Sequence, residues 1–362
     1  MLRVLMIVRT TLYTVRGGDT VQVLQTAAGL MDNNIQVDIK KTDEVIDYNN
    51  YDLLHFFNIT RPADILVHIK RSGKPFVVSP ILIDYSEYDK YHRKGMAGFI
   101  FRFLSTNGIE YMKTISRWLR GKDKMVSLSY IWKGQRGSVR EILDKTALVL
   151  PNSDSEYRRL IKMYGCKPGY IVIPNGVDPR LFVSDEKIKK DPQLLICVAR
   201  VEGIKNQYNL IRAVNNTDFR LLIIGAAAPN QQAYYNSCRE MAASNITFIE
   251  HVSQEELVNY YQQALVHVLP SWFETTGLSS LEAGAMGCNI VITDRGDTRE
   301  YFADDAVYCD PGSAESIYIA VAKAAALPPN KSLQEKILTH YIWKQATIHT
   351  MEAYKRIKNI WD

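Results

Sequence analysis

Residues 264–285 read ALVHVLPSWFETTGLSSLEAGA, and this stretch indicates most directly which fold the chain adopts. The apolar run over 264–269 predicts a buried strand, a Pro-Ser turn follows it, and a glycine-containing loop opens a helix. Glu274 is expected to lie before this helix and Glu282 inside its first turn. Both carboxylates are therefore predicted to face the same ligand.

The start of this helix suits an anion. Backbone amides around Gly277, Leu278 and Ser279 carry partial positive charge, and Gly277 lets a diphosphate approach the backbone closely. Because carboxylates repel phosphates, the hydroxyls of a sugar and a ribose are the expected partners of Glu274 and Glu282. The pattern predicts a nucleotide-sugar site. A structural alternative for Glu282 stays open, in which Ser279 caps the helix and Glu282 completes a capping box.

Apolar strands alternate with helical segments, such as 21–31 and 155–163, along the whole chain. A chain of 362 residues with this pattern predicts two doubly wound parallel sheets in two domains. The stretch 174–192 has three prolines and a charged run, and is expected to be an exposed linker. The predicted strands are 4–8, 36–40, 53–57, 76–79 and 147–150, then 194–199, 219–224, 246–249, 266–269, 289–293 and 306–308.

The run that contains Glu274 and Glu282 resembles the acidic signature of retaining glycosyltransferases of the GT-B fold, specifically glycosyltransferase family 4. Other stretches resemble the same family in order along the chain. They are VIPNGVD at 172–178, VARVEGIK at 198–205, LLIIG at 221–225 and the segment 296–300. The resemblance covers most of the chain and is strongest over about 148–311.

The resemblance implies an α/β fold with two Rossmann-like doubly wound parallel-sheet domains that face an interdomain cleft. Residues 1–173 would bind the acceptor, with a basic amphipathic insertion over about 90–145. Residues 174–342 would bind the nucleotide-sugar, and 343–362 would form a helix that crosses back to the first domain.

The resemblance also implies roles for single residues. Glu274, Arg200 and Lys205 would be catalytic, and the two cations would neutralise the leaving diphosphate without a metal ion or other cofactor. The donor would be a nucleotide-diphosphate sugar, linked to UDP or to GDP. The implied donor-binding residues are Gly17, Gly18, Arg200, Lys205, Val252, Glu274, Thr276, Gly277, Leu278, Ser279 and Glu282.

The chain departs from the family after its fourth expected strand. Many members carry a histidine there, whereas this chain reads VVSPILIDYSEY over 77–88. Asp84 is one candidate for its role, and His55 and Asn58, at the end of the third strand, are candidates for the acceptor side. Each of the three also fits a capping or packing role.

Positive charge is concentrated in one segment. Residues 90–145 hold 13 lysines and arginines against 4 acidic residues, interleaved with aromatic and aliphatic side chains. Such a segment suits the surface of an anionic membrane. A helical insertion that packs its apolar face on its own domain fits the same residues. Nucleic acid is not an expected partner, since no recognition motif accompanies the charge.

Cysteine usage indicates a compartment. The five cysteines are odd in number and widely spaced, which predicts reduced thiols in or near the core rather than disulfides or a zinc site. The apolar run 2–8 is too short for a signal peptide or membrane span and is expected to be a buried strand. The predicted location is the cytoplasm, at the inner face of the cell membrane if the insertion binds lipid.

These observations predict a retaining, metal-independent glycosyltransferase. It would move a sugar from a nucleotide-diphosphate sugar to a hydroxyl acceptor, such as a lipid-linked or surface polysaccharide or glycolipid intermediate. Two alternatives stay open. One is a catalytically silent nucleotide-sugar-binding protein, and the other is a GT-B sugar phosphorylase.

Overall fold

The computed structural model describes residues 1–93, 95–121, 127–185 and 187–361, with side chains up to residue 357. The described residues form two compact units. The first takes in 1–90, 94–174 and 343–362, and the second 91–93 and 175–342. The first unit thus extends one residue beyond the expected boundary at 173.

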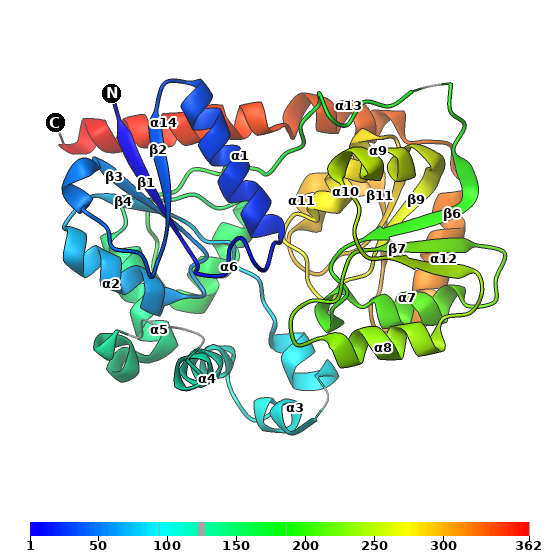
Figure 1. The fold of residues 1–362 in the computed structure, drawn as a ribbon, viewed down its shortest axis with the longest axis horizontal. Helices are drawn as coiled ribbons and strands as arrows, with labels where there is room; N and C mark the ends of the chain where they lie inside the picture. Colours follow the sequence, from blue (N-terminus) through cyan, green and yellow to red (C-terminus); the bar gives the residue numbers. More distant parts are fainter. Residues whose placement is uncertain (94, 122–126, 186, 362) are drawn as a thin grey trace. The chain divides into compact units, whose positions relative to one another are not determined.

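The first unit is built on a parallel five-stranded sheet in the order β2-β1-β3-β4-β5 (Figure 1). All five residues of β3 and all four of β4 are buried, as expected for central strands covered by helices on both faces. The strands are β1 (Arg3–Val8), β2 (Gln36–Lys41), β3 (Leu53–Phe57), β4 (Phe76–Ser79) and β5 (Leu148–Val149). The main helices are α1 (Gly18–Asp32), α2 (Pro62–Ser72), α5 (Leu128–Lys145), α6 (Asp154–Tyr164) and α14 (Trp343–Trp361).

Helix α14 belongs to the first unit although it follows the second in sequence. It runs alongside α1 in Figure 1, and a Cβ on Gly29 of α1 would lie 2.0 Å from Oγ1 of Thr347. A hydrogen bond of 2.7 Å also joins the Tyr354 hydroxyl to Nδ1 of His55 on β3. Close backbone packing and this buried bond hold α14 on the first sheet.

The second unit is built on a parallel six-stranded sheet in the order β11-β10-β9-β6-β7-β8. Each predicted strand is present, and the two predicted sheets are confirmed. The strands are β6 (Asp191–Val198), β7 (Arg220–Ile224), β8 (Ile246–Ile249), β9 (Ala264–Leu269), β10 (Asn289–Thr293) and β11 (Ala306–Cys309). The helices are α7 (Gln207–Val214), α8 (Gln232–Met241), α9 (Gln254–Gln263), α10 (Leu278–Ala285), α11 (Thr298–Phe302), α12 (Ala314–Ala325) and α13 (Lys331–His340).

The expected exposed linker over 174–192 is wrong in part. Val177 and Phe182 are buried in the core of the second unit, and the Lys190 ammonium donates to the carbonyl of Tyr261 at 2.7 Å. Strand β6 begins at Asp191, inside the predicted linker. The segment's prolines and charges predicted exposure, but its few apolar residues anchor it.

The predicted insertion is helical. It contains α3 (Gly95–Phe101), α4 (Thr106–Leu119) and α5, which is kinked at Gly134. Its predicted basic residues Lys94, Lys122 and Lys124 lie outside the described residues.

Two further expectations concern burial and length. All five cysteines are buried, as predicted, and none is paired in a disulfide. Among the described residues, the helices are too short or too polar to cross a bilayer.

A glycine directly after β7 permits a close approach of two backbone segments. Gly225 has φ of +143°, and a Cβ there would lie 2.1 Å from the carbonyl oxygen of Ala199. Gly225→Ala should therefore destabilise the second unit by more than about 2 kcal/mol, because backbone atoms must move. Thermal unfolding of both proteins measures the difference.

Gly287→Ala is the matched control. Gly287 also has positive φ, +76°, but the nearest atom to a Cβ there would be the side-chain Cε of Lys190, at 3.5 Å. The strain of its φ alone costs about 1 to 2 kcal/mol. Equal losses of melting temperature in the two variants would contradict the importance of the contact with Ala199.

Candidate functional site

The candidate site lies where the connections of the second sheet change direction. Strands β6 and β9 are neighbours, and the chain leaves β6 toward one edge of the sheet and β9 toward the other. Such a switch point is where open α/β sheets bind ligands, beyond the carboxyl ends of the strands. Lys205 follows β6 and Glu274 follows β9. Lys205 and Glu274, two of the three predicted catalytic residues, therefore lie on opposite sides of the switch point.

Lys205 and Glu274 form an ion pair. The Lys205 ammonium contacts Oε1 of Glu274, and the Ser271 hydroxyl donates to the same oxygen at 2.7 Å. The Glu274 residue is only 6% exposed, whereas the Lys205 side chain is 23% exposed. The carboxylate is thus fixed by two partners, while the ammonium retains access to a ligand.

The backbone of Glu274 is also fixed. Its amide donates to the carbonyl of Arg295 at 3.0 Å, and its carbonyl accepts from the amide of Asp297 at 2.9 Å. Between them lies Gly296, with φ of +111°, where a Cβ would lie 1.9 Å from the Glu274 carbonyl oxygen. Only glycine fits this approach. Gly296 lies in one of the stretches that resemble the family, but the sequence analysis did not predict this role for it.

A buried asparagine holds the Lys205 loop. Asn206 adopts the left-handed conformation with φ of +60°, and its side-chain amide donates to the carbonyls of Pro270 and Pro311 at 3.0 and 2.8 Å. The amide of Trp272 donates to the carbonyl of Ile204 at 2.9 Å. These bonds join the loop after β6 to the loops after β9 and β11.

Arg200 lies on the same loop as Lys205 but has a different partner. Its guanidinium donates to Oε1 of Glu202 at 2.8 Å, and its carbonyl accepts from the Gln207 side chain at 2.9 Å. The Arg200 side chain is 37% exposed. The structure therefore brings Lys205 to Glu274, but it pairs Arg200 with an acid that sequence reasoning had not singled out.

Helix α10 begins at a left-handed glycine. Gly277 is its N-cap, with φ of +70°, and the first intrahelical bonds are made by the amides of Ser280 and Leu281. The amides of Leu278 and Ser279 precede those bonds, as at any helix start. This geometry leaves the expected anion-binding backbone at the predicted position.

Two details of the prediction for α10 are wrong. Glu282 is the fifth residue of the helix and lies beyond its first turn. Ser279 is the second residue and does not cap the helix, so the capping-box alternative fails as well. The helix starts earlier than expected because Gly277 takes the cap position without a side chain.

Thr276 is buried in a network that the sequence did not reveal. The Asn175 side-chain amide donates to the Thr276 hydroxyl at 3.0 Å, which donates to the Tyr301 hydroxyl at 3.2 Å. The Asn175 backbone amide also donates to Tyr301, at 3.3 Å. Asn175 lies in the stretch 172–178 that resembles the family, and this resemblance was the sequence signal that could have pointed to the network. The network fixes the loop that precedes α10.

Glu282 has a hydroxyl partner of its own. The Tyr261 hydroxyl donates to Oε2 of Glu282 at 3.1 Å. Removal from water raises the pKa of Glu282 from 4.5 to about 7, and the Tyr261 bond opposes that rise. Burial lowers the pKa of His267 to about 3, and the His267 ring contacts the Ser280 hydroxyl at 3.3 Å. Glu282 can therefore change charge near neutral pH.

Val252, one of the predicted donor-binding residues, follows β8. Val252 is half-buried and packs on the second core, whereas His251 is exposed. Ser253 caps α9 in a capping box with Glu256, with bonds of 3.1 and 2.9 Å. This box holds Val252 at the carboxyl edge of the sheet.

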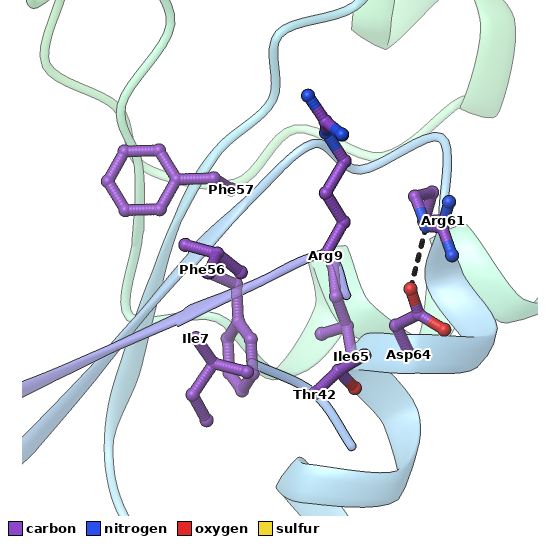
Figure 2. A pocket seen from close by; sticks show the side chains of 9 residues that line it. Ile7, Arg9, Thr42, Phe56, Phe57, Arg61, Asp64 and Ile65 are labelled. Carbon is purple, nitrogen blue, oxygen red and sulfur yellow. Dashed lines mark hydrogen bonds and ion pairs between the residues drawn. The ribbon is translucent and has the colours of Figure 1, made fainter. Parts of the chain in front are cut away.

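The first unit has a pocket at the equivalent place in its own sheet. It lies between β1 and β3, the switch point of the order β2-β1-β3-β4-β5 (Figure 2). Arg9 and Arg61 line it together with Asp64, whose Oδ2 accepts from Nε of Arg61 at 2.7 Å. The sequence did not predict this pocket, because Arg9, Arg61 and Asp64 belong to none of the stretches that resemble the family.

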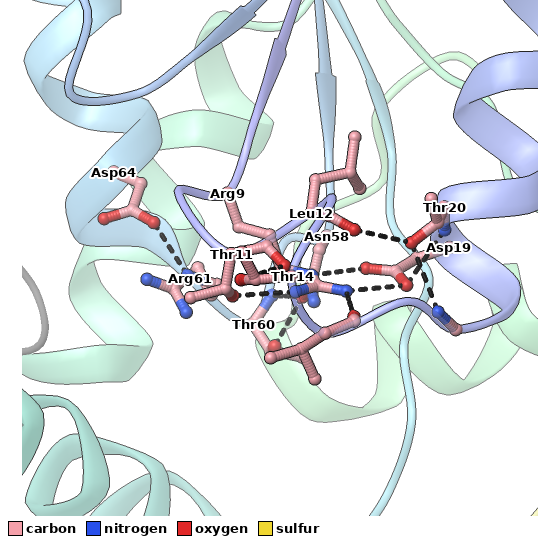
Figure 3. Close-up of polar contacts among 12 residues, drawn as sticks. Arg9, Thr11, Leu12, Thr14, Asp19, Thr20, Asn58, Thr60, Arg61 and Asp64 are labelled. Carbon is pink, nitrogen blue, oxygen red and sulfur yellow. Dashed lines mark hydrogen bonds and ion pairs between the residues drawn. The ribbon is translucent and has the colours of Figure 1, made fainter. Parts of the chain in front are cut away.

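Arg9 is held by the loop after β1 (Figure 3). It donates to Asp19 at 2.6 Å and to the carbonyl of Val15 at 2.6 Å. Gly17 and Gly18 stand at the start of α1, as the N-cap and the first residue. The Gly17 amide, in a predicted donor-binding residue, already donates to the Thr20 hydroxyl at 3.2 Å.

The acceptor-side candidates have structural partners. Both ring nitrogens of buried His55 are bonded, to Tyr354 at 2.7 Å and Ser79 at 2.9 Å, and burial lowers its pKa to about 3. These bonds and the burial of His55 favour its packing alternative. Asp84 caps a turn by accepting from the amide of Ser86 at 2.9 Å, and Asn58 accepts from the amide of Thr60 at 3.1 Å.

Within the described residues, acidic, histidine and cysteine side chains form no group of three that could hold a metal ion. Positive charge near Glu274 comes instead from Lys205 and from the helix start.

Residues 180–337 match the family described as Glycosyl transferases group 1. The chain is similar to D-inositol 3-phosphate glycosyltransferase of Kineococcus radiotolerans, at 24% identity over 204 residues, which cover 50% of this chain and 47% of that protein. The chain spans about half the length of the curated relatives it matches. Over residues 180–337 this match agrees with the family that the sequence predicted.

Solved structures share the fold over nearly the whole chain. Sucrose-phosphate synthase from Thermosynechococcus elongatus has a TM-score of 0.77 at 15% identity, and covers 99% of this chain and 100% of that chain. HepE of Anabaena in complex with UDP and glucose has a TM-score of 0.69 at 13% identity, and covers 98% and 100%. The predicted GT-B class of fold is confirmed.

The raised pKa of Glu282 predicts how stability depends on pH. Between 4.5 and about 7 the folded protein binds more protons at Glu282 than the unfolded chain does. This residue's contribution to stability is therefore lost as pH rises through that window, by at most about 3 kcal/mol. Glu282→Gln removes the effect, so its melting temperature relative to the unmodified protein should rise between pH 5 and pH 8.

Exposed Glu255 provides the control, since Glu255→Gln should shift the melting temperature equally at both pH values. A pH-independent difference for Glu282→Gln would show that Glu282 ionises normally in the fold.

Proposed function

We propose that this chain, whose residues 180–337 match group 1 glycosyltransferases, transfers a sugar from a nucleoside diphosphate sugar to an acceptor hydroxyl. The observation that carries the proposal is the Lys205–Glu274 ion pair at the switch point of the second sheet, next to the start of α10. A cation, a fixed carboxylate and backbone amides together match the three parts of such a donor: diphosphate, sugar and linkage.

Lys205 is assigned to the diphosphate. Its ammonium is partly exposed and already faces a carboxylate, so it can gain a phosphate oxygen as a second partner. Glu274 is assigned to the sugar hydroxyls, because Ser271 and Lys205 both contact Oε1 and so fix the carboxylate's orientation. The ion pair thus couples the position of the sugar to that of the leaving group.

Arg200 and the start of α10 are also assigned to the diphosphate. The amides of Leu278 and Ser279 offer dipole-oriented donors. Arg200 would share its guanidinium between Glu202 and a phosphate oxygen, since its five donors allow both contacts. Glu282 and the stretch at Val252 are assigned to the ribose and the base.

We propose transfer with retention of anomeric configuration. The bond between the anomeric carbon and the diphosphate oxygen breaks, and the acceptor oxygen forms its bond on the same face. The acceptor proton passes to the departing phosphate oxygen, so atoms and charge balance without a protein nucleophile. Lys205 and the helix amides then stabilise the negative charge that grows on the diphosphate.

The acceptor is assigned to the first unit. The switch point of its sheet, between β1 and β3, brings Arg9 and Arg61 to one edge, and guanidinium groups suit the anionic groups of an acceptor. The similar proteins are named for D-inositol 3-phosphate and sucrose phosphate, which supports an acceptor that bears phosphate. A lipid-linked or polysaccharide intermediate satisfies the same chemistry.

Removing either member of the ion pair should suppress turnover. Lys205→Ala and Glu274→Gln are each expected to lower kcat by roughly 100-fold to 1,000-fold, because a preorganised contact in the transition state is lost. Steady-state release of the nucleoside diphosphate measures the effect. Lys189→Ala and Glu255→Gln change exposed residues of the same types and should leave the rate unchanged.

The double variant Lys205→Ala with Glu274→Gln separates catalysis from stability. Lys205→Ala alone leaves a buried carboxylate without its cation, which destabilises the fold. The double variant removes both charges, so its melting temperature should recover while its turnover stays low. Recovery of turnover together with stability would mean that the pair is only structural.

Activity should not depend on a divalent metal, because Lys205, Arg200 and the helix amides supply the positive charge. Donor turnover in excess chelator is expected to equal turnover with added Mg²⁺. Reversible loss of activity on chelation would refute this assignment.

A screen of nucleotide-sugars tests the function itself. The purified chain is incubated with UDP-linked and GDP-linked hexoses, starting with UDP-glucose, and slow release of the nucleoside diphosphate is measured without acceptor. Donor binding without any release would indicate a silent binding protein. Formation of sugar phosphate that depends on added phosphate would indicate a phosphorylase.

A further inference from the structure

Helix α3 displays an apolar face that its own unit does not cover. The helix exposes Met96, Phe99 and Ile100, and Phe103 is exposed in the turn that follows it. Phe99 is 65% exposed and Phe103 77%. The Phe99 and Phe103 rings contact each other edge to face with centroids 5.6 Å apart. These side chains therefore form one patch rather than scattered positions.

A second group lies on the two neighbouring helices. Trp118 and Leu119 at the end of α4, and Leu128 and Trp132 at the start of α5, are all exposed, Trp132 by 90%. In Figure 1, α3 and α4 lie farther from the strands of the first sheet than α5 does. We name the insert surface as Met96, Phe99, Ile100, Phe103, Trp118, Leu119, Leu128 and Trp132.

Packing within the first unit accounts for other residues of the same segment. Ile109 and Tyr130 are buried where α4 meets α5. Ile142 and Leu143, on α5, are buried in the core of the first unit. The expected packing role is thus confirmed for these side chains. It does not account for the insert surface, whose members remain open to solvent.

Positive charge surrounds this surface. Arg102 follows α3, Arg120 follows α4, and Arg136 lies on α5, and all three are exposed. Of the nearby acids, Asp89 and Glu110 share the single ammonium of Lys113, and Asp144 is exposed. Lys133 and Lys145 likewise both contact Glu141, at 2.8 and 2.9 Å. The surface thus presents arginines and apolar rings together.

We propose that the insert surface binds the face of an anionic lipid bilayer. The apolar rings enter the boundary between head groups and acyl chains, while the arginines contact lipid phosphates. A tryptophan at this depth keeps its ring nitrogen within reach of the head groups. Charge complementarity selects a bilayer over a second copy, because two copies of this surface would bring like charges together.

The proposal is independent of the proposed transferase activity. Binding to vesicles is measured without donor or acceptor, so a chain that proved to be a silent binding protein would give the same result. The proposal concerns where the protein acts, and the site in the second unit does not depend on it.

Co-sedimentation with vesicles tests it. The full chain is mixed with phosphatidylcholine vesicles, with or without about 30% phosphatidylglycerol, at low ionic strength. We expect binding to the anionic vesicles, weakened when salt rises to about 0.5 M. The double variant Phe99→Ser with Phe103→Ser should bind at least about tenfold more weakly, because two inserted rings are lost.

Matched variants distinguish this surface from general stickiness. Val45→Ser with Ile319→Ser removes two exposed apolar side chains elsewhere and should bind as the unmodified chain does. Arg120→Gln with Arg136→Gln should weaken binding only to anionic vesicles, whereas Lys187→Gln with Lys189→Gln should not. Circular dichroism verifies that each variant is folded.

Three outcomes would overturn the proposal. The unmodified chain does not bind anionic vesicles at low salt, or it binds them as tightly after Phe99 and Phe103 are replaced. In the third, sedimentation equilibrium without lipid shows a dimer that the same double variant dissociates, while vesicles bind neither protein. That result would assign the surface to self-association.

Discussion

The contact between Gly296 and the carbonyl of Glu274 is the constraint on which the second unit's site depends. A side chain at position 296 would collide with that carbonyl, 1.9 Å away, so the loop after β10 can lie against the loop after β9 only with glycine. The neighbouring bonds to Arg295 and Asp297 then fix Glu274 on both sides. Its carboxylate consequently meets Lys205 from the next strand, although 69 positions separate them.

Periodicity predicted the strands well because parallel sheets covered on both faces need continuous apolar runs. The position of Lys205 and Glu274 followed from the order of strands and loops, which motifs record. Side-chain partners were harder to predict. Tyr354 as the partner of His55 depends on which distant segments of the chain fold together. No local pattern carries that information.

Segment 90–145 shows why composition leaves such questions open. An amphipathic helix has an apolar face whether that face meets a core or water, so the same pattern fits both outcomes. The structure divides the segment, with Ile142 and Leu143 in the core and Phe99 and Phe103 outside it. An exposed apolar group is informative only after its neighbours are known. Helix α10 gave a similar lesson, since a glycine N-cap leaves no side-chain signal at its start.

The bond between His55 and Tyr354 joins residues 299 positions apart. The first sheet therefore gains its covering helix only after the whole of the second unit has left the ribosome. Closing so long a loop slows folding more than it lowers final stability. During synthesis, the flank of α1 that packs against Thr347 therefore stays exposed to water until α14 has been made.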